Sequence, residues 1–204
     1  MPDALSDALF DAPLAPELQQ AVGDAGQDPA VKPVSEQFLR LQLASEITVL
    51  FPVQQLTEVL TLAVGQIVPL PHMPAWVMGV YNWRGEILWM VDLGHLCGLT
   101  PWYQQIASAS SLSAVVLDVA SLKSASSQAL GLVVSHVEDI EWLDPNLIQF
   151  SSTAGISSAA SSNPEVMAKL APFLWGHWQQ SEENEDAIAV LDGKAIVAAV
   201  KRGQ

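Results

Sequence analysis

The sequence predicts a mainly β fold made of many short strands. Half of the 204 residues are apolar, and they fall in short runs separated by glycine, proline and polar residues. No run approaches the roughly 20 residues of a membrane-spanning helix, because prolines and charged residues interrupt the longest candidates. Closely spaced short strands are typical of closed or nearly closed barrels and argue against a parallel α/β sheet.

The folded part opens with a predicted hairpin. Residues 38–43 and 47–53 are β-type runs divided by a polar turn. Residues 56–62 fit either a strand with a bulge or a turn of helix, since one apolar residue breaks the alternation. Residues 67–70 form a further short run. The two prolines that follow exclude a central strand, so we expect a short helix at residues 75–78.

A second hairpin and a helix complete the first half. Residues 80–83 and 87–91 are apolar strands joined by a three-residue turn, where Gly85 adopts a positive φ at low cost. Residues 93–99 are compatible with a helix, and Asp92 is its candidate N-cap.

The second half again ends in an apolar helix after an aspartate. Asp192 is the candidate N-cap of a helix over residues 193–200. The shared ending suggests two similar β-units. The expected strands are residues 114–119, 130–137, 140–143, 173–178 and 187–191, and the expected loops are residues 104–113, 121–128 and 151–163.

The formal net charge of −14 is unevenly distributed along the chain. Residues 1–35 hold six acidic residues, one lysine and five prolines, a composition that cannot bury enough apolar surface to fold. We therefore expect a mobile acidic tail over residues 1–35 and one folded domain over residues 36–204. Eight scattered cations supply neither the basic patch of a nucleic-acid binder nor that of a membrane-surface protein, so both classes are excluded.

The first residues lack the basic and apolar segments of a secretory signal, which indicates the cytoplasm.

Nucleotide-binding and esterase motifs are absent from the sequence. Cys97 cannot form an internal disulfide and lies in an apolar stretch, where cysteine behaves as a small hydrophobe. We expect no catalytic residue, no metal and no cofactor. The four histidines are too widely spaced for paired metal ligands: His72, His95, His136 and His177.

Two features keep an alternative function open. Seven tryptophans could stack on a ligand, although core and rim packing is their ordinary role. A run of acids after His136 could provide paired carboxylates or a solvated rim. The alternative is therefore a small-ligand-binding or hydrolytic β-barrel protein that uses the tryptophans and this cluster. Its acids are Glu138, Asp139, Glu141 and Asp144.

The most specific stretch is residues 69–93. A proline-rich turn leads to Gly79-Val80-Tyr81-Asn82-Trp83-Arg84-Gly85, and an apolar strand ending in Asp92-Leu93 follows. As a bare pattern this is a polar hairpin turn. In this order, the elements resemble the CheW-like domain, the adaptor module of bacterial chemosensory arrays. The resemblance extends over roughly residues 36–200, with residues 129–134 similar to the central strand of the family's second subdomain.

The resemblance implies two intertwined five-stranded SH3-like β-barrel subdomains with short helices and a hydrophobic groove between them. It also implies a non-catalytic adaptor that couples the cytoplasmic tip of a methyl-accepting chemoreceptor to the regulatory domain of a CheA-type histidine kinase. Such an adaptor is cytoplasmic, recruited to membrane receptor arrays, and serves chemotaxis or type IV pilus motility. Aligned with the family's motif, the expected partner-binding residues are Leu56, Glu58, Asn82, Arg84, Gly85 and Val137.

The residues themselves allow structural roles as well. Arg84 at a turn can offer a guanidinium fork to a partner's carboxylate, or it can brace the hairpin through an internal salt bridge. Glu58 can be an ordinary exposed strand residue. Asp92 is better explained as a helix cap than as a contact.

Overall fold

A computed structural model describes residues 35–44, 47–105, 110–118, 129–150, 164–179 and 187–203. All of them belong to the compact unit Val34–Gln204. Apart from Ser35, the expected tail lies outside the described residues, as do the expected loops at residues 121–128 and 151–163.

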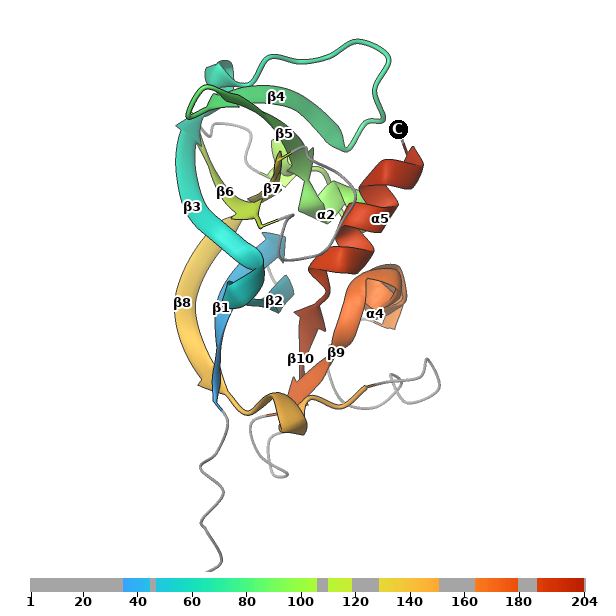
Figure 1. Ribbon diagram of the computed structural model, residues 1–204. Coiled ribbons are helices and arrows are strands. Elements are labelled where there is room, and N and C mark those ends of the chain that lie inside the picture. The colour runs from blue at the N-terminus through green and yellow to red at the C-terminus, as the bar shows by residue number, and fades with distance from the viewer. Residues whose placement is uncertain are drawn as a thin grey trace, which may run out of the picture. The chain divides into compact units, whose positions relative to one another are not determined.

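The described chain forms two five-stranded sheets and is mainly β, as predicted (Figure 1). We call them the terminal sheet and the middle sheet, after the parts of the chain that supply most of their strands. The terminal sheet has the order β8-β1-β2-β10-β9, and the middle sheet has the order β3-β6-β7-β5-β4. The strands are β1 (Glu36–Ala44), β2 (Ile47–Pro52), β3 (Leu56–Ala63), β4 (Val77–Trp83), β5 (Glu86–Asp92), β6 (Ser111–Leu117), β7 (Ala129–Val134), β8 (His136–Leu143), β9 (Leu174–Gln179) and β10 (Ala187–Leu191).

The two sheets are intertwined along the chain. The terminal sheet is made of the first two and the last three strands, whereas β3 to β7 form the middle sheet. β7, expected as the central strand of one subdomain, is the central strand of the middle sheet, where it pairs in parallel with β5 and antiparallel with β6. The predicted single strand 130–137 is therefore wrong: the chain leaves the middle sheet at Ser135, and Val137 belongs to β8 in the terminal sheet.

Most strands are buried on both faces, which explains the high apolar content. Alternate residues of β6 enter different clusters: Ala114 and Val116 pack inside the middle sheet, while Val115 and Leu117 pack in a core that both sheets share. In the terminal sheet, Leu50 packs in a third cluster. Two-sided burial favours continuous apolar runs over strict alternation.

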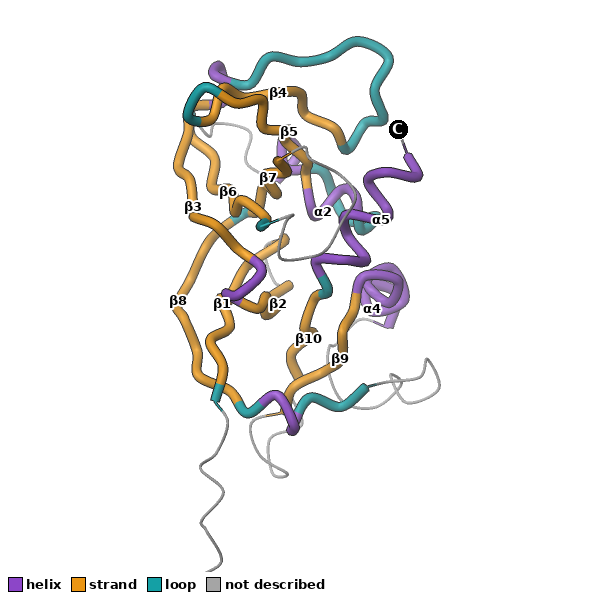
Figure 2. Tube along the Cα trace, in the orientation of Figure 1, coloured by secondary structure: helices purple, strands orange, loops and turns teal. Residues whose placement is uncertain are grey.

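Short helices cover the shared core (Figure 2). The carboxylate of Asp92 accepts hydrogen bonds from the backbone of His95 (3.0 Å) and Trp102 (2.9 Å), and that of Asp192 accepts one from Lys194 (2.9 Å), so both predicted caps are confirmed. The α-helices are α2 (Leu93–Leu96), α3 (Trp102–Gln105), α4 (Pro164–Leu170) and α5 (Gly193–Gly203); the 3-10 helices are η1 (Val53–Gln55), η2 (Val64–Gln66), η3 (Pro145–Leu147) and η4 (Ala171–Phe173).

Two further predictions need correction. Residues 75–78 are not helical: a turn leads directly into β4 at Val77, and Val68 forms a bridge with Val80. Neither sheet is a barrel closed by backbone pairing, because within the described residues no ladder joins β3 to β4 or β8 to β9. No helix in the described part of the chain is long and apolar enough to cross a bilayer.

Candidate functional site

A cluster of three side chains joins the two edge strands of the middle sheet. We call Glu58, Trp83 and Arg84 the hairpin cluster. Glu58 lies on β3 at one edge, and Trp83 ends β4 at the other edge. The Glu58 carboxylate accepts hydrogen bonds from the Trp83 indole N–H and from the Arg84 guanidinium. Side chains therefore connect edges that no backbone ladder joins among the described residues.

The turn that presents Arg84 has a specific backbone conformation. Trp83 pairs with Glu86, which leaves Arg84 and Gly85 as a two-residue loop. Both have positive φ, 53° and 87°, as in a type I′ hairpin turn. The side chain of Asn82 accepts a hydrogen bond from the Gly85 N–H at 3.1 Å. Asn82 and Gly85 thus fix the turn, and Arg84 stands at its tip.

The geometry leaves most of Arg84 accessible. Its side chain is 67% exposed, whereas that of Glu58 is 22% exposed. The guanidinium carbon lies 5.3 Å from the centre of the Trp83 ring, within the range of a cation–π contact. A guanidinium carries five N–H donors, so Arg84 can bind Glu58 and still offer donors to a partner. The internal salt bridge expected as one role of Arg84 is present.

The two apolar candidates, Leu56 and Val137, pack partly buried against the shared core. Leu56 lies on the same strand as Glu58, whereas Val137 pairs with Leu41 in the terminal sheet. Of the six candidates predicted from the sequence, the structure places Glu58, Asn82, Arg84 and Gly85 around one turn and its salt bridge. The other two, Leu56 and Val137, lie at the core that both sheets share. The predicted groove there stays a prediction.

Trp83 is the member of the hairpin cluster that was not among the expected binding residues. The sequence showed it as one of seven tryptophans and as a position without an assigned role in the motif of residues 79–85. Its position between Asn82 and Arg84 was the available signal. Its hydrogen bond to Glu58, 25 residues away in the sequence, forms only because the two edge strands meet in space.

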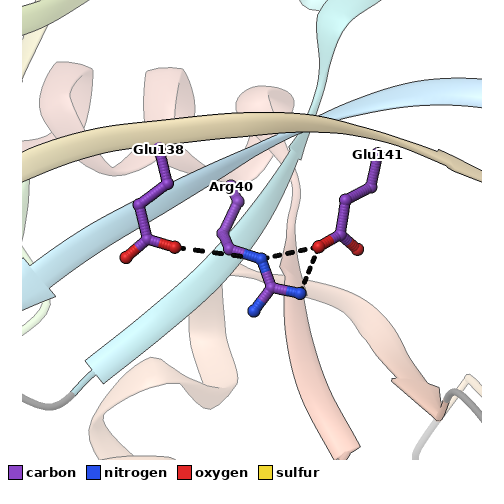
Figure 3. A network of polar contacts seen from close by, with 3 residues as sticks. All are labelled: Arg40, Glu138 and Glu141. Carbon is purple, nitrogen blue, oxygen red and sulfur yellow. Dashed lines mark hydrogen bonds and ion pairs between the residues drawn. The ribbon is translucent and has the colours of Figure 1, made fainter.

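The acidic cluster after His136 is largely engaged in structural contacts (Figure 3). Arg40 of β1 donates from Nε to Glu141 at 2.7 Å, and the same nitrogen lies 3.9 Å from Glu138. Asp144 accepts hydrogen bonds from the backbone and side chain of Asn146 at the start of η3. Across the described ranges, no group of three or more His, Cys, Asp or Glu side chains could hold a metal ion.

Two further titratable candidates, Cys97 and His177, are buried. Burial, reinforced by the negative charge of Asp92, raises the pKa of the Cys97 thiol to about 12, so this cysteine is not an activated nucleophile. His177 is 7% exposed, and neither ring nitrogen has a hydrogen-bond partner within the described structure. Burial lowers its pKa.

Comparison with known proteins agrees with this architecture. Residues 37–201 match the CheW-like domain, so the chain belongs to the CheW-like domain family. The fold is similar to the crystal structure of the scaffolding protein TtCheW from Thermoanaerobacter tengcongensis, with a TM-score of 0.58 and 16% identity over 82% of this chain and 90% of that one. A search of curated proteins gave no match. Family membership supports a scaffold or adaptor role in chemotaxis.

Proposed function

We propose that this protein is a non-catalytic adaptor that couples chemoreceptors to a CheA-type histidine kinase. The observation that carries the proposal is the exposed Arg84 at the tip of a fixed turn, within a chain that belongs to the CheW-like family. An adaptor needs surfaces that bind two partners and needs no reaction centre. The buried thiol of Cys97 and the ion pair between Glu141 and Arg40 are consistent with structural roles for these residues in such an adaptor.

The mechanism is selection of a partner by a preorganised charge. Asn82 and Gly85 hold the turn, so little conformational entropy is lost when Arg84 binds. A planar guanidinium can form two parallel hydrogen bonds with a carboxylate, which gives both affinity and geometric specificity. We therefore expect an acidic residue on the kinase regulatory domain or the receptor tip opposite Arg84.

Leu56 and Val137 would supply the apolar part of recognition. Both are partly buried against the shared core, so a partner that covers them would extend an existing apolar cluster. A surface of this kind would serve a receptor array for chemotaxis or for pilus-based motility. The alternative of a hydrolytic protein is less favoured, because Glu138 and Glu141 surround Arg40 and Asp144 caps a helix.

The test is calorimetric titration of the full chain with a CheA-type regulatory domain and, separately, with a receptor-tip fragment. Arg84→Asn is the informative variant, because asparagine tolerates positive φ and keeps the turn. Loss of one charge-assisted contact should weaken binding by about tenfold or more. Arg202→Asn, at an exposed position near the end of α5, is the matched control and should bind as the wild type does. Absence of binding to both partners at micromolar concentrations would reject the proposal.

A further inference from the structure

The two sheets have four edge strands, and two of them have a backbone bridge on their outer side in the described structure. Gln149 forms a bridge with His177 on β9, and Val68 forms one with Val80 on β4. At β3, within the described residues, only the side chain of Glu58 reaches across the edge, to Trp83 and Arg84. β8 pairs with β1 on one side only, and no described residue pairs with its other side. An uncovered edge presents unpaired N–H and C=O groups that a further strand can bind.

Exposed apolar side chains lie on this same edge. Ile140 is 51% exposed and Trp142 is 66% exposed. They pair with Leu39 and Gln37 of β1 in regular register, so they project from one face of the sheet. The register shift lies between the pairs Leu39–Ile140 and Leu41–Val137, which leaves Ile140–Leu143 as the regular part of the edge.

Acidic residues flank this regular stretch. Glu138 and Asp139 precede it, Glu141 lies within it, and Asp144 follows it, with Arg40 as the cation that pairs with Glu138 and Glu141 (Figure 3). A negative rim around exposed apolar side chains complements a segment with apolar and basic residues. The same charges oppose a second copy of this chain: antiparallel pairing of two Ile140–Leu143 stretches would place Asp139 opposite Asp144 of the other copy.

We propose that the β8 edge binds an extended segment of a partner protein in which apolar residues alternate with lysine or arginine. The segment adds as a strand beside Ile140–Leu143, covers Ile140 and Trp142 with its apolar side chains, and places its cations near Asp139 and Asp144. This surface is in the terminal sheet and is independent of the hairpin cluster in the middle sheet. The test of this proposal is therefore independent of the test of the proposed function.

The test uses a blocked peptide of about eight residues, alternating lysine and valine and matched to the length of β8. Its affinity is measured by calorimetry, and native hydrogen exchange identifies the amides that it protects. We expect slower exchange at those amides of residues 140–143 that point away from β1, and unchanged exchange at the edge of β3. A peptide of the same sequence with N-methylated central residues cannot donate backbone hydrogen bonds and should not protect these amides.

Two pairs of protein variants separate strand addition from general attraction to an acidic protein. Asp139→Lys should weaken peptide binding by about tenfold, while Glu86→Lys, the same charge reversal on an exposed strand residue of the other sheet, should weaken it less than about twofold. Trp142→Ser should also cost about tenfold, while Tyr103→Ser, at another exposed aromatic residue, should not. Equal binding of the N-methylated peptide, equal effects within either pair, or a dimer of the free protein that already protects residues 140–143 would overturn the proposal.

Discussion

The carboxylate of Glu58 on β3 binds the guanidinium of Arg84 in the turn after β4, across the two opposite edges of the middle sheet. The same carboxylate accepts the indole N–H of Trp83. One acidic side chain thus connects strands that lie at the two ends of the sheet order. The contact also holds the exposed arginine over the Trp83 ring. We expect this relationship to contribute to both stability and recognition, and the two contributions can be measured separately.

Glu58→Gln should lower the free energy of unfolding by about 1 kcal/mol, because it weakens the charge-assisted bond to Trp83. The Arg84 contact should add little, since a mostly exposed ion pair contributes about 0–1 kcal/mol. Urea unfolding monitored by circular dichroism measures the change. Glu86→Gln, at an exposed position of the same sheet, should alter stability by less than about 0.5 kcal/mol. Equal effects of the two substitutions would contradict a specific role for Glu58.

Gly79→Ala should destabilise the fold by about 3 kcal/mol or more. Gly79 has a φ of 138°, and a Cβ there would meet the backbone carbonyl of Val68, which cannot move without breaking the Val68–Val80 bridge. Gly65→Ala is the matched control, because a Cβ at Gly65 meets nothing within 4 Å. Thermal unfolding of the two variants should separate them clearly, and similar melting temperatures would argue against the described path of residues 67–80.

Stability should fall as pH drops below about 6.5, the ordinary pKa of histidine. Burial lowers the pKa of His177 in the folded protein, so the unfolded chain takes up the proton first and is stabilised relative to the folded state. The loss of unfolding free energy due to His177 should be complete once the pH is below the pKa of His177 in the folded protein. Urea unfolding between pH 7.5 and 5.5 measures it. His177→Leu should reduce this dependence, and His136→Asn, at an exposed position, should leave it unchanged. The same slope in both variants would contradict the assignment.

Cys97 should resist thiol reagents in the folded protein. A thiol that is 2% exposed with a pKa of about 12 forms almost no thiolate at pH 8, and the thiolate is the reactive species. Labelling with a disulfide reagent should therefore be slow in native buffer and rapid in guanidinium chloride. Stoichiometric labelling within seconds in native buffer would show that the site around α2 is more open than described.

Local signals predicted the hairpins and helix caps well. Gly85 in the turn after β4, and the aspartates before α2 and α5, act through backbone geometry within a few residues, and the structure confirms each of them. The mainly β architecture also followed from composition, because strands buried on two faces need long apolar runs. The resemblance of residues 69–93 supplied the family, which the match over residues 37–201 confirms.

Long-range pairing was less predictable. The polar residues Ser135 and His136 interrupt the expected strand 130–137, but such a pair does not by itself show that the strands on either side, β7 and β8, belong to different sheets. Residues 75–78 looked helical, but residues 75–76 form a turn and β4 begins at Val77, with Val80 bridged to Val68. In the candidate site, the motif indicated Glu58 and Arg84 individually. The contact between Glu58 and Arg84, and the hydrogen bond from Trp83 to Glu58, form only because the sheet brings its two edges together. No local sequence pattern predicts this long-range arrangement.

The most direct test of the central claim is calorimetric binding of the charge-swapped variant Glu58→Arg/Arg84→Glu to a CheA-type regulatory domain and to a receptor tip. The swap keeps an internal ion pair between β3 and the turn but reverses the charge presented to solvent. If Arg84 contacts a partner, the double variant should remain folded by circular dichroism and lose binding to at least one partner by about tenfold or more. Wild-type affinity of the folded double variant for both partners would show that Arg84 only braces the hairpin, and would contradict the proposed binding site.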